Sequence, residues 1–288
     1  MKILVTGKNG QVGYELERSL QGLGEVVAVD RSQMDLSDLQ QMRNVIRSIK
    51  PNLIVNAAAY TTVDKAESEP ELAMRINGEA PGVMAEEAKR LGAGIIHYST
   101  DYVFDGRKET AYVENDPTCP INVYGATKLA GEQAIQAAGV PHIILRTSWV
   151  YGMRGKNFLL TVKRLAGERD ELRIVGDQFG SPTWCRTIAN TTAQLVARMD
   201  ATAVGAVTGP LSGIYHLTSS GRTSWHGFAE EIVKHASIAK PPKVTAICTE
   251  EYPLPAERPR NSELSGERLR SLHLYVPHWQ HALALCQG

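Results

Sequence analysis

The sequence lacks an excess of either charge. It has 31 Lys and Arg residues against 31 Asp and Glu residues in a chain of 288. Proteins that bind nucleic acid usually carry a positive excess that neutralises the phosphates. We therefore expect no nucleic-acid partner.

The sequence also lacks long apolar runs and paired cysteines. Its apolar runs are short, such as residues 53–55 and 143–145, whereas a membrane-spanning helix needs about 20 apolar residues. The first residues offer no apolar core of a signal peptide. The cysteines lie far apart, without a Cys-x-x-Cys pair, at Cys119, Cys185, Cys248 and Cys286. We expect free thiols in a cytoplasmic protein with no membrane partner.

Hydrophobic residues make up 43% of the chain, enough for a sizeable core. Short apolar strands alternate with amphipathic helices in the first half. We expect strands at residues 3–5, 26–29, 53–58, 94–99 and 142–149, and helices at 11–21, 39–49, 81–91 and 124–138. Continuous apolar strands that alternate with helices predict an α/β fold, a Rossmann-type doubly wound parallel sheet.

The pattern loosens after Gly152, which suggests a second unit. Helices are expected at residues 158–165, 184–199 and 225–235, and a strand at 213–218. We expect residues 1–152 to form a dinucleotide-binding domain, onto which residues 183–220 pack back. Residues 153–288 would mainly form a smaller C-terminal substrate-binding lobe.

The first expected strand runs directly into three glycines, Gly7, Gly10 and Gly13, and then into a helix. Glycines permit a tight turn and let the backbone approach a pyrophosphate, and the helix N-terminus supplies free N–H donors. This order predicts a dinucleotide site. The competing interpretation is a glycine turn that only joins strand to helix.

Two neighbouring residues at the end of the second expected strand favour different cofactors. Asp30 can accept hydrogen bonds from ribose hydroxyls, whereas Arg31 can pair with a 2′-phosphate. NADH and NADPH therefore both stay open. Asp35 and Leu36 follow and could line the adenine, or Asp35 could begin a helix.

Tyr124 and Lys128 lie four residues apart in an expected helix, so they share a face. A nearby ammonium favours the phenolate and lowers the pKa of a tyrosine. This pair therefore predicts acid–base chemistry. The fourth expected strand ends at Ser99 and Thr100, of which only one hydroxyl should face the cofactor.

Several segments together resemble the extended short-chain dehydrogenase/reductases. These are the glycine turn at 7–13, NAAA at 56–59, STDYVFDG at 99–106 and YGATK at 124–128. A narrower resemblance, to the dTDP-4-dehydrorhamnose reductases, rests on AAYTTVDKAE (58–67), RTSWVYG (146–152), GDQFGSPT (176–183), GIYH (213–216) and RPRNS (258–262). These segments span nearly the whole chain.

The resemblance implies reduction of the C4 ketone of dTDP-4-dehydro-6-deoxy-L-mannose to dTDP-L-rhamnose with NADH or NADPH. It implies that Tyr124 is the proton donor, Lys128 its electrostatic partner and ribose ligand, and Thr100 the tuning hydroxyl. Asp101 and Trp149 would touch the sugar nucleotide. The implied cofactor-lining residues are Gly10, Gln11, Val12, Asp30, Asp35, Leu36, Ala59, Tyr60, Thr61 and Tyr98.

Some members of this family bind Mg²⁺ through glutamates at a dimer interface. Glu15 matches one such position, but no glutamate follows Trp279. The sequence therefore leaves Mg²⁺ doubtful, and the chain could be a monomer or a homodimer.

Two other functions remain open at this stage. One is a different sugar-nucleotide reductase, epimerase or dehydratase on the same scaffold. The other is a non-catalytic regulatory subunit of the kind that serves methionine adenosyltransferase. The presence of both Tyr124 and Lys128 favours an enzyme.

Overall fold

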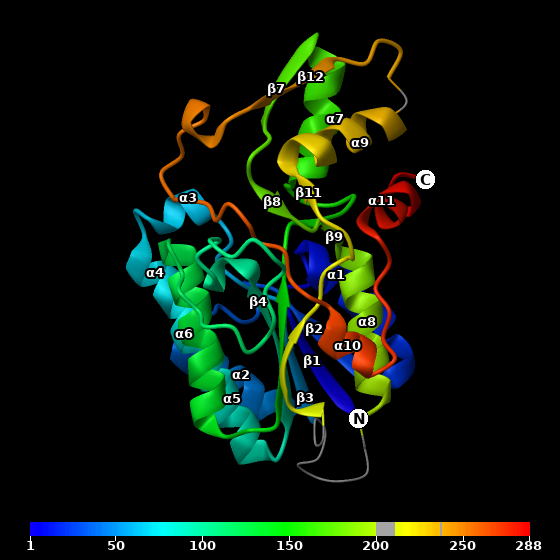
Figure 1. Cartoon of the computed structure of the whole chain (residues 1–288). Helices are drawn as coiled ribbons and strands as arrows, with labels where there is room; N and C mark the ends of the chain where they lie inside the picture. Colours follow the sequence, from blue (N-terminus) through cyan, green and yellow to red (C-terminus); the bar gives the residue numbers. More distant parts are fainter. Residues whose placement is uncertain (200–210, 237) are drawn as a thin grey trace.

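The computed structural model describes residues 1–199, 211–236 and 238–288. At its centre lies a six-stranded parallel sheet with the order β10-β5-β4-β3-β1-β2 (Figure 1). Its strands are β1 (Lys2–Thr6), β2 (Glu25–Val29), β3 (Leu53–Asn56), β4 (Gly94–Thr100), β5 (His142–Thr147) and β10 (Gly213–His216). This confirms the expected parallel sheet.

Both faces of the sheet are covered by helices. Neighbouring residues of a strand point to opposite faces, and here the residues on both faces are apolar. Ile3 and Val5 join one hydrophobic cluster, and Leu4 joins the other. One face packs against α1 (Gln11–Ser19) and α8 (Cys185–Ala197). The other face packs against α2 (Leu39–Ile49), α5 (Ala80–Leu91) and α6 (Val123–Ala138). The sheet is therefore doubly wound, as expected.

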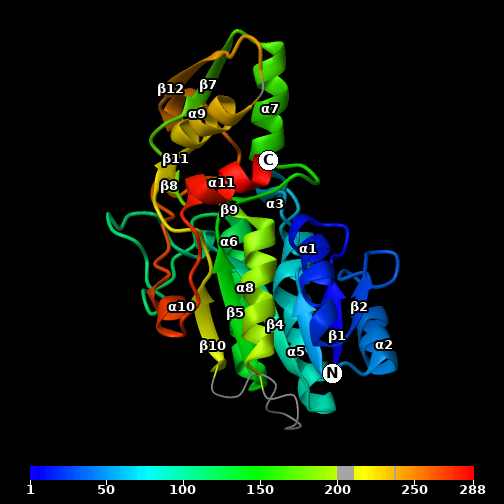
Figure 2. The same cartoon turned by 90° about the vertical axis from the view of Figure 1, so that its right-hand side faces the viewer.

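A smaller lobe lies beyond the carboxyl ends of the strands (Figure 2). Its core is built around Tyr151, Phe228 and Trp279. Its main elements are α7 (Phe158–Glu168), β7 (Glu171–Val175), α9 (Trp225–His235), β12 (Lys243–Ile247) and α11 (Trp279–Gln287). Short paired strands connect it to the sheet: β6 (Val150–Tyr151) with β9 (Thr183–Trp184), and β8 (Phe179–Gly180) with β11 (Thr223–Ser224).

The chain then returns from this lobe towards the sheet and reaches α10 (Glu267–Ser271), in orange in Figure 1. Residues 256–264 form the part that we call the crossing segment. It bridges to Phe179 through Asn261 and to Tyr112 through Leu264. The crossing segment thereby connects the lobe with the loop that follows β4.

The helices α3 (Val63–Ala66) and α4 (Pro70–Met74) follow β3. Between α4 and α5 the chain makes a π-helical turn, η2 (Arg75–Glu79). Within the described residues, no helix is long and apolar enough to cross a membrane.

The structure differs from expectation at the end of the fifth strand. We expected this strand to reach Trp149, but β5 ends at Thr147. The reason is local, because Trp149 has a φ of 45°, in the left-handed region that a strand does not allow. The chain therefore turns at Trp149 into the smaller lobe.

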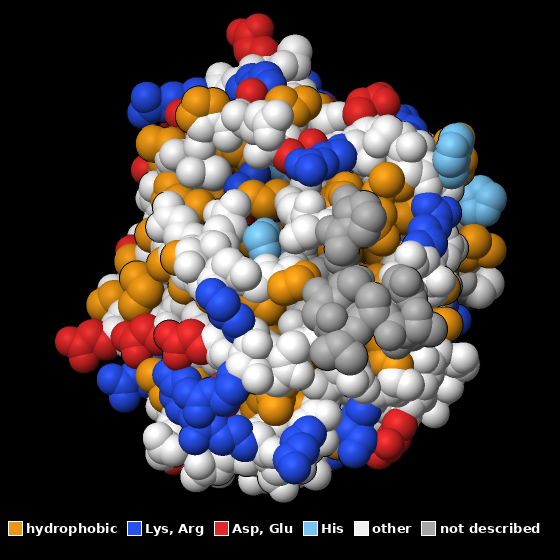
Figure 3. All heavy atoms as spheres, turned by 90° about the horizontal axis from the view of Figure 1, so that it is seen from below, with side chains coloured by type: hydrophobic (Ala, Val, Ile, Leu, Met, Phe, Trp, Pro, Cys, Tyr) orange, Lys and Arg blue, Asp and Glu red, His pale blue; other side chains and the backbone are white. Residues whose placement is uncertain are grey.

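Parts of the segment 183–220 lie against the first unit. Helix α8 packs on α1, and β10 pairs with β5 at the edge of the sheet. Residues 200–210 of that segment lie outside the described residues. Figure 3 shows the face seen from below, where Lys and Arg side chains lie among Asp and Glu side chains.

Candidate functional site

The turn between β1 and α1 has the geometry of a phosphate cradle. Gly7 has a φ of +73°, and a Cβ at Gly13 would lie 2.1 Å from the Gly7 carbonyl oxygen. Gly10 precedes the first helical turn and makes no side-chain cap. The first N–H groups of α1 can therefore donate hydrogen bonds to an anion. A side chain at position 13 would collide with the Gly7 carbonyl and disrupt the turn. The turn fits a dinucleotide pyrophosphate.

Asp30 lies at the end of β2, beside this turn. Its carboxylate accepts hydrogen bonds from the Ser32 N–H at 2.9 Å and the Ser32 hydroxyl at 2.6 Å. These hydrogen bonds lower the pKa of Asp30 to about 2. Arg31 instead pairs with Asp35 at 3.1 Å. An ionised carboxylate and an exposed guanidinium thus lie next to each other, so the geometry accommodates either cofactor. Leu36 is buried in the core.

The loop of Ala59, Tyr60 and Thr61 after β3 is held by Asn77, which the sequence did not single out. The Asn77 amide accepts a hydrogen bond from the Tyr60 N–H at 2.8 Å and donates to the Tyr60 carbonyl at 3.0 Å. Asn77 lies in the π-helical turn η2. Such turns often occur at functional sites, but nothing in the local sequence marks this one.

Of the two predicted cofactor-lining residues of α1, Gln11 lies at the junction with the smaller lobe and Val12 lies against the sheet. The Gln11 amide oxygen accepts a hydrogen bond from Asn157 at 2.8 Å, and Val12 packs against the core. Tyr98 differs from both, because its ring is buried and its hydroxyl hydrogen-bonds with Thr192 at 2.7 Å. Only the backbone of Tyr98 is directed towards α6, where its carbonyl receives Lys128.

Tyr124 lies in the first turn of α6, which Asn122 caps by accepting from the Gly125 N–H at 2.8 Å. Burial raises the pKa of Tyr124 to about 12, and a hydrogen bond with Thr100 opposes this rise. We expected Lys128 to lower this pKa. The structure shows the reverse, because the phenol is desolvated and the lysine amine hydrogen-bonds elsewhere.

Lys128 is only 2% exposed. Its Nζ donates to the Tyr98 carbonyl at 2.6 Å and lies 3.2 Å from His97 Nε2. Burial lowers the pKa of Lys128 to about 8, and the Glu132 carboxylate opposes this fall. His97 is a second residue that the sequence analysis missed.

Thr100 and Asp101 end β4 and begin the following turn. The Thr100 hydroxyl donates to Asp101 Oδ1 at 3.0 Å and accepts from the Tyr102 N–H at 3.2 Å. Ser99 Oγ is buried and has no hydrogen-bond partner among the described residues. Of the two neighbouring hydroxyls, Thr100 is the one that lowers the pKa of Tyr124.

Asp101 is 3% exposed, and its Oδ2 has no hydrogen-bond partner in the described part of the chain. Burial raises the pKa of Asp101 to about 7, although hydrogen bonds from Ser262 and Thr100 favour its charged form. This carboxyl group therefore titrates close to neutral pH.

Trp149, the other predicted sugar-contacting residue, lies at the turn from β5 into the smaller lobe. Its ring stacks on Trp225 with the centroids 3.5 Å apart and the planes at 5°. A Cβ at Gly180 would lie 2.6 Å from the Trp149 ring and 2.8 Å from Ser262 Oγ. Since Ser262 also lowers the pKa of Asp101, the two predicted sugar-contacting residues border the same segment.

A cavity of about 880 Å³ is lined in part by the crossing segment. Four acidic side chains lie in its wall: Asp105, Glu109, Asp177 and Glu257. Five basic side chains also line it: Arg107, Lys108, Arg222, Arg258 and Arg260. The sequence did not predict this cavity, because its lining comes from four separate stretches of the chain, 105–109, 177–179, 222 and 257–261.

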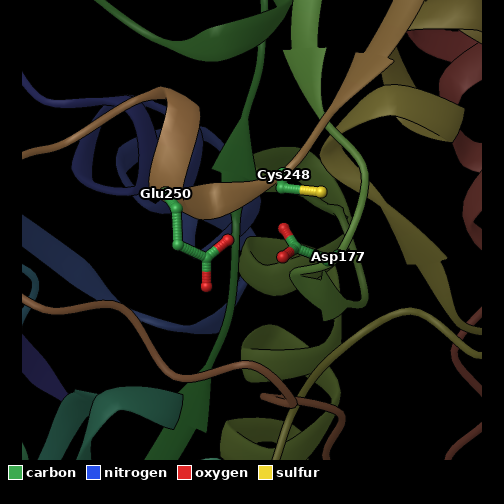
Figure 4. A group of neighbouring side chains, drawn as sticks. All are labelled: Asp177, Cys248 and Glu250. Atoms are coloured by element: carbon green, nitrogen blue, oxygen red, sulfur yellow. The ribbon is translucent and has the colours of Figure 1, made fainter.

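Asp177, Cys248 and Glu250 lie near this cavity (Figure 4). One potential ligand atom from each lies within 4.8 Å of the others. However, Asp177 accepts hydrogen bonds from the Thr249 N–H and hydroxyl, and Glu250 pairs with Arg260 at 3.1 Å. Both carboxylates thus already have protein partners.

Glu15, the candidate Mg²⁺ ligand, pairs with Arg186 of α8 at 3.1 Å. The ion pair joins α1 to α8. A metal ion at this carboxylate would compete with the guanidinium.

Comparison with known proteins gives a consistent result along the whole chain. The family model described as the RmlD substrate binding domain matches residues 1–287. A dTDP-4-dehydrorhamnose reductase of Burkholderia thailandensis is 51% identical, over 99% of this chain and 98% of the relative.

Two solved structures are also similar. A dTDP-4-dehydrorhamnose reductase of Clostridium acetobutylicum has a TM-score of 0.92 and 36% identity, covering 99% of this chain and 98% of that one. The enzyme of Bacillus anthracis in complex with NADP has a TM-score of 0.91 and 35% identity, with the same coverage, 99% and 98%.

Proposed function

The chain belongs to the dTDP-4-dehydrorhamnose reductase family, and from this premise we propose that it reduces the C4 ketone of dTDP-4-dehydro-6-deoxy-L-mannose with NAD(P)H. The product is dTDP-L-rhamnose. The observation that carries the proposal is the position of Lys128, one helical turn from Tyr124: its Nζ donates to the Tyr98 carbonyl at 2.6 Å, near the carboxyl end of β4, where ligands bind in open parallel sheets.

Tyr124 is the proton donor in this proposal. NAD(P)H supplies the hydride when it is bound, and the ketone oxygen then needs a proton. A tyrosine whose pKa is about 12 remains a neutral phenol at neutral pH and can give that proton. Thr100 orients the phenol through its hydroxyl. Lys128 holds cofactor ribose hydroxyls and provides positive charge beside the phenol.

The sugar nucleotide would lie between Trp149, Asp101 and the cavity beside the crossing segment. Trp149 offers an apolar surface to the deoxysugar, and Asp101 offers a carboxyl group to its hydroxyls. Arg222 and Arg260 line the neighbouring cavity. Their guanidinium groups suit a nucleoside diphosphate, because guanidinium groups bind phosphate oxygens in pairs.

Asp30 and Arg31 are compatible with NADH and with NADPH. Glu15 leaves Mg²⁺ optional, so a chelator should neither dissociate the protein nor abolish its activity. The protein could act as a monomer or as a homodimer. We place it in the cytoplasm, on the basis of four unpaired cysteines.

The direct test is to add dTDP-4-dehydro-6-deoxy-L-mannose and follow the absorbance of NADH or NADPH. We expect one reduced cofactor to be oxidised for each dTDP-L-rhamnose formed. An epimerase or dehydratase recycles its cofactor, so turnover of the sugar without net oxidation would contradict the proposal. A regulatory subunit would give no turnover with either cofactor.

A further inference from the structure

A line of buried polar side chains runs from Lys128 away from the proposed reaction centre. Lys128 Nζ lies 3.2 Å from His97 Nε2, and His97 Nδ1 lies 3.0 Å from the Asn56 amide nitrogen. Asn56 Oδ1 lies 2.7 Å from the Thr6 hydroxyl, which accepts from the Ala58 N–H at 3.0 Å. The line joins α6 to β4, β3 and β1.

These groups are almost fully buried. Lys128 is 2% exposed, and His97, Asn56 and Thr6 are each 1% exposed. Buried polar groups need hydrogen-bond partners, because a buried donor or acceptor without one destabilises the fold. Burial and the neighbouring Lys128 together lower the pKa of His97, so the imidazole is neutral. It therefore has one N–H donor and one acceptor nitrogen.

The line has two self-consistent hydrogen-bond arrangements. In the arrangement that the structure shows, the Asn56 amide nitrogen faces His97 Nδ1 and donates to it, so that Nε2–H donates to a neutral Lys128 amine. In the other, the Asn56 amide is reversed, the His97 Nδ1–H donates to the Asn56 carbonyl oxygen, and Nε2 accepts from a Lys128 ammonium. Asn56 can turn its amide because the Thr6 hydroxyl can donate to its oxygen or accept from its nitrogen.

We propose that His97 is a positioning residue that stays hydrogen-bonded to Lys128 in both protonation states of the amine, by exchanging one imidazole tautomer for the other. This inference rests on the proposed function of Lys128. The Lys128 amine therefore keeps its place beside β4 whether it carries the proton or has released it.

The proposal gives the reaction a way to restore Tyr124. The Tyr124 O–H bond breaks as the substrate alkoxide gains its proton. A Lys128 N–H bond then breaks as the phenolate regains a proton, and the neutral amine accepts from His97 Nε2–H. A proton from water recharges the amine. A pKa of about 8 for Lys128 supports this cycle, because both forms are then populated near neutral pH.

Other charged groups face Lys128 and influence its titration. Glu132 lies one turn further along α6 and raises the pKa of Lys128, while Arg146 of β5 pairs with Glu132 at 2.7 Å. Asp101 titrates near 7 beyond Thr100. A pH–rate profile alone would therefore combine the titrations of Lys128 and Asp101. The test needs separate signals from Lys128 and from His97.

Nuclear magnetic resonance of the full chain supplies both signals. Long-range ¹H–¹⁵N spectra report which nitrogen of His97 carries the proton, and ¹³Cε labelling reports the titration of Lys128. Signals that disappear in His97→Gln and Lys128→Ala assign the two residues. We expect the ¹⁵N shifts of His97 to change with the same midpoint as the Lys128 signal. His97 shifts that stay constant through the Lys128 titration would overturn the proposal, and this measurement needs only the wild-type fold.

Two substitutions then separate hydrogen bonding from packing. His97→Gln keeps an oxygen near the position of Nε2, and we expect the Lys128 pKa and kcat to stay near those of the wild type. His97→Leu removes the partner, and we expect it to lower the Lys128 pKa by about 1 and kcat by about tenfold, with little change in substrate KM.

His216→Leu is the matched control, because His216 is a second fully buried histidine, on β10, that does not contact Lys128. It should leave the Lys128 pKa unchanged. Equal effects of the two leucine variants on that pKa, or a wild-type Lys128 pKa in folded His97→Leu, would refute the role of His97. A wild-type protein that oxidised no NAD(P)H would refute the proposed function. The His97 and Lys128 signals would still test the tautomer exchange, because they do not depend on turnover.

Discussion

At the scale of single residues, the site works by burying ionisable groups. Burial is the largest cause of three pKa shifts, and each shift favours the uncharged form of its group. The three groups belong to Tyr124, Lys128 and Asp101. A neutral phenol and an amine that titrates near 8 suit proton donation to a reduced ketone. The energetic cost of this desolvation must be met by the rest of the fold.

Asp101 gives a prediction about stability and pH. Its pKa is raised from 3.8 to about 7. Below about pH 4 the Asp101 carboxyl is protonated in both the folded and the unfolded protein. Between about pH 4 and about pH 7 it is protonated only in the folded protein. The wild type therefore loses stability over this interval, and Asp101→Asn does not. We expect the Tm difference in favour of Asp101→Asn to grow from about pH 4 to about pH 7 and then level off.

Thermal melts of the two proteins across this pH range are the measurement. A Tm difference that is the same at every pH would show that Asp101 is ionised throughout in the folded protein. The assignment of this carboxyl as a buried neutral acid would then be wrong.

At the scale of elements, α6 carries both the proposed acid, Tyr124, and the amine of Lys128, and Asn122 caps its N-terminus. Asn122 caps it and also donates to the Glu257 carbonyl at 2.8 Å, at the edge of the crossing segment. Asn77 contacts α6 through the Thr127 hydroxyl at 3.2 Å. The first turn of α6, where Tyr124 lies, is therefore fixed from two sides.

Asn122→Ala should destabilise the protein by about 1 kcal/mol, as loss of a helix N-cap commonly does. It should also lower kcat, because the freed first turn carries Tyr124. The matched control is Asp38→Ala, which removes the N-cap of α2, where Asp38 accepts from the Gln41 N–H at 2.9 Å. We expect a similar loss of stability from the control in urea unfolding, with kcat unchanged. Equal kcat values for the two variants would contradict a positioning role for the α6 cap.

At the scale of the whole molecule, a buried ion pair connects the proposed catalytic helix to the sheet. Arg146 of β5 makes a two-point contact with Glu132 of α6, at 2.9 and 2.7 Å, and their side chains are 3% and 1% exposed. Arg146 also reaches the Glu114 carbonyl at 3.4 Å. This contact holds one helix layer against the sheet through charge as well as through apolar packing.

Glu132→Gln should therefore be costly, by about 3–5 kcal/mol, because it leaves a buried guanidinium without its counter-charge. Glu168→Gln is the matched control, because it breaks the pair with Arg164, in which the two side chains are 51% and 60% exposed. We expect the control to cost less than about 1 kcal/mol in the free energy of urea unfolding. If both substitutions cost the same, the interior pair would not stabilise the fold as described.

Much of this architecture follows from short-range sequence patterns. Gly7, Gly10 and Gly13 after an apolar strand predict the cradle, because each glycine meets a local steric demand. Tyr124 and Lys128 are recognisable because helical spacing places them on one face. The parallel sheet follows from strands that are apolar on both faces.

Other features depend on contacts between distant residues and could not be predicted. His97 lies in a strand whose neighbours are mostly apolar, and only the fold brings it to Lys128. Asn77 meets Tyr60 through a π-helical turn without a sequence signature. The cavity beside the crossing segment forms because the fold brings Arg222 and Arg260, far apart in the sequence, to one lining. The low pKa expected for Tyr124 was wrong because burial could not be read from spacing.

The most direct test of the account is the rate of ketone reduction by Tyr124→Phe at saturating cofactor and sugar nucleotide. Calorimetry would measure cofactor affinity in the same preparation. We predict that cofactor binding stays close to that of the wild type while the rate falls by about 100-fold or more, because the only change at the site is the lost phenolic proton. Tyr124→Phe that reduces the ketone at the wild-type rate would contradict the assignment of Tyr124 as the proton donor.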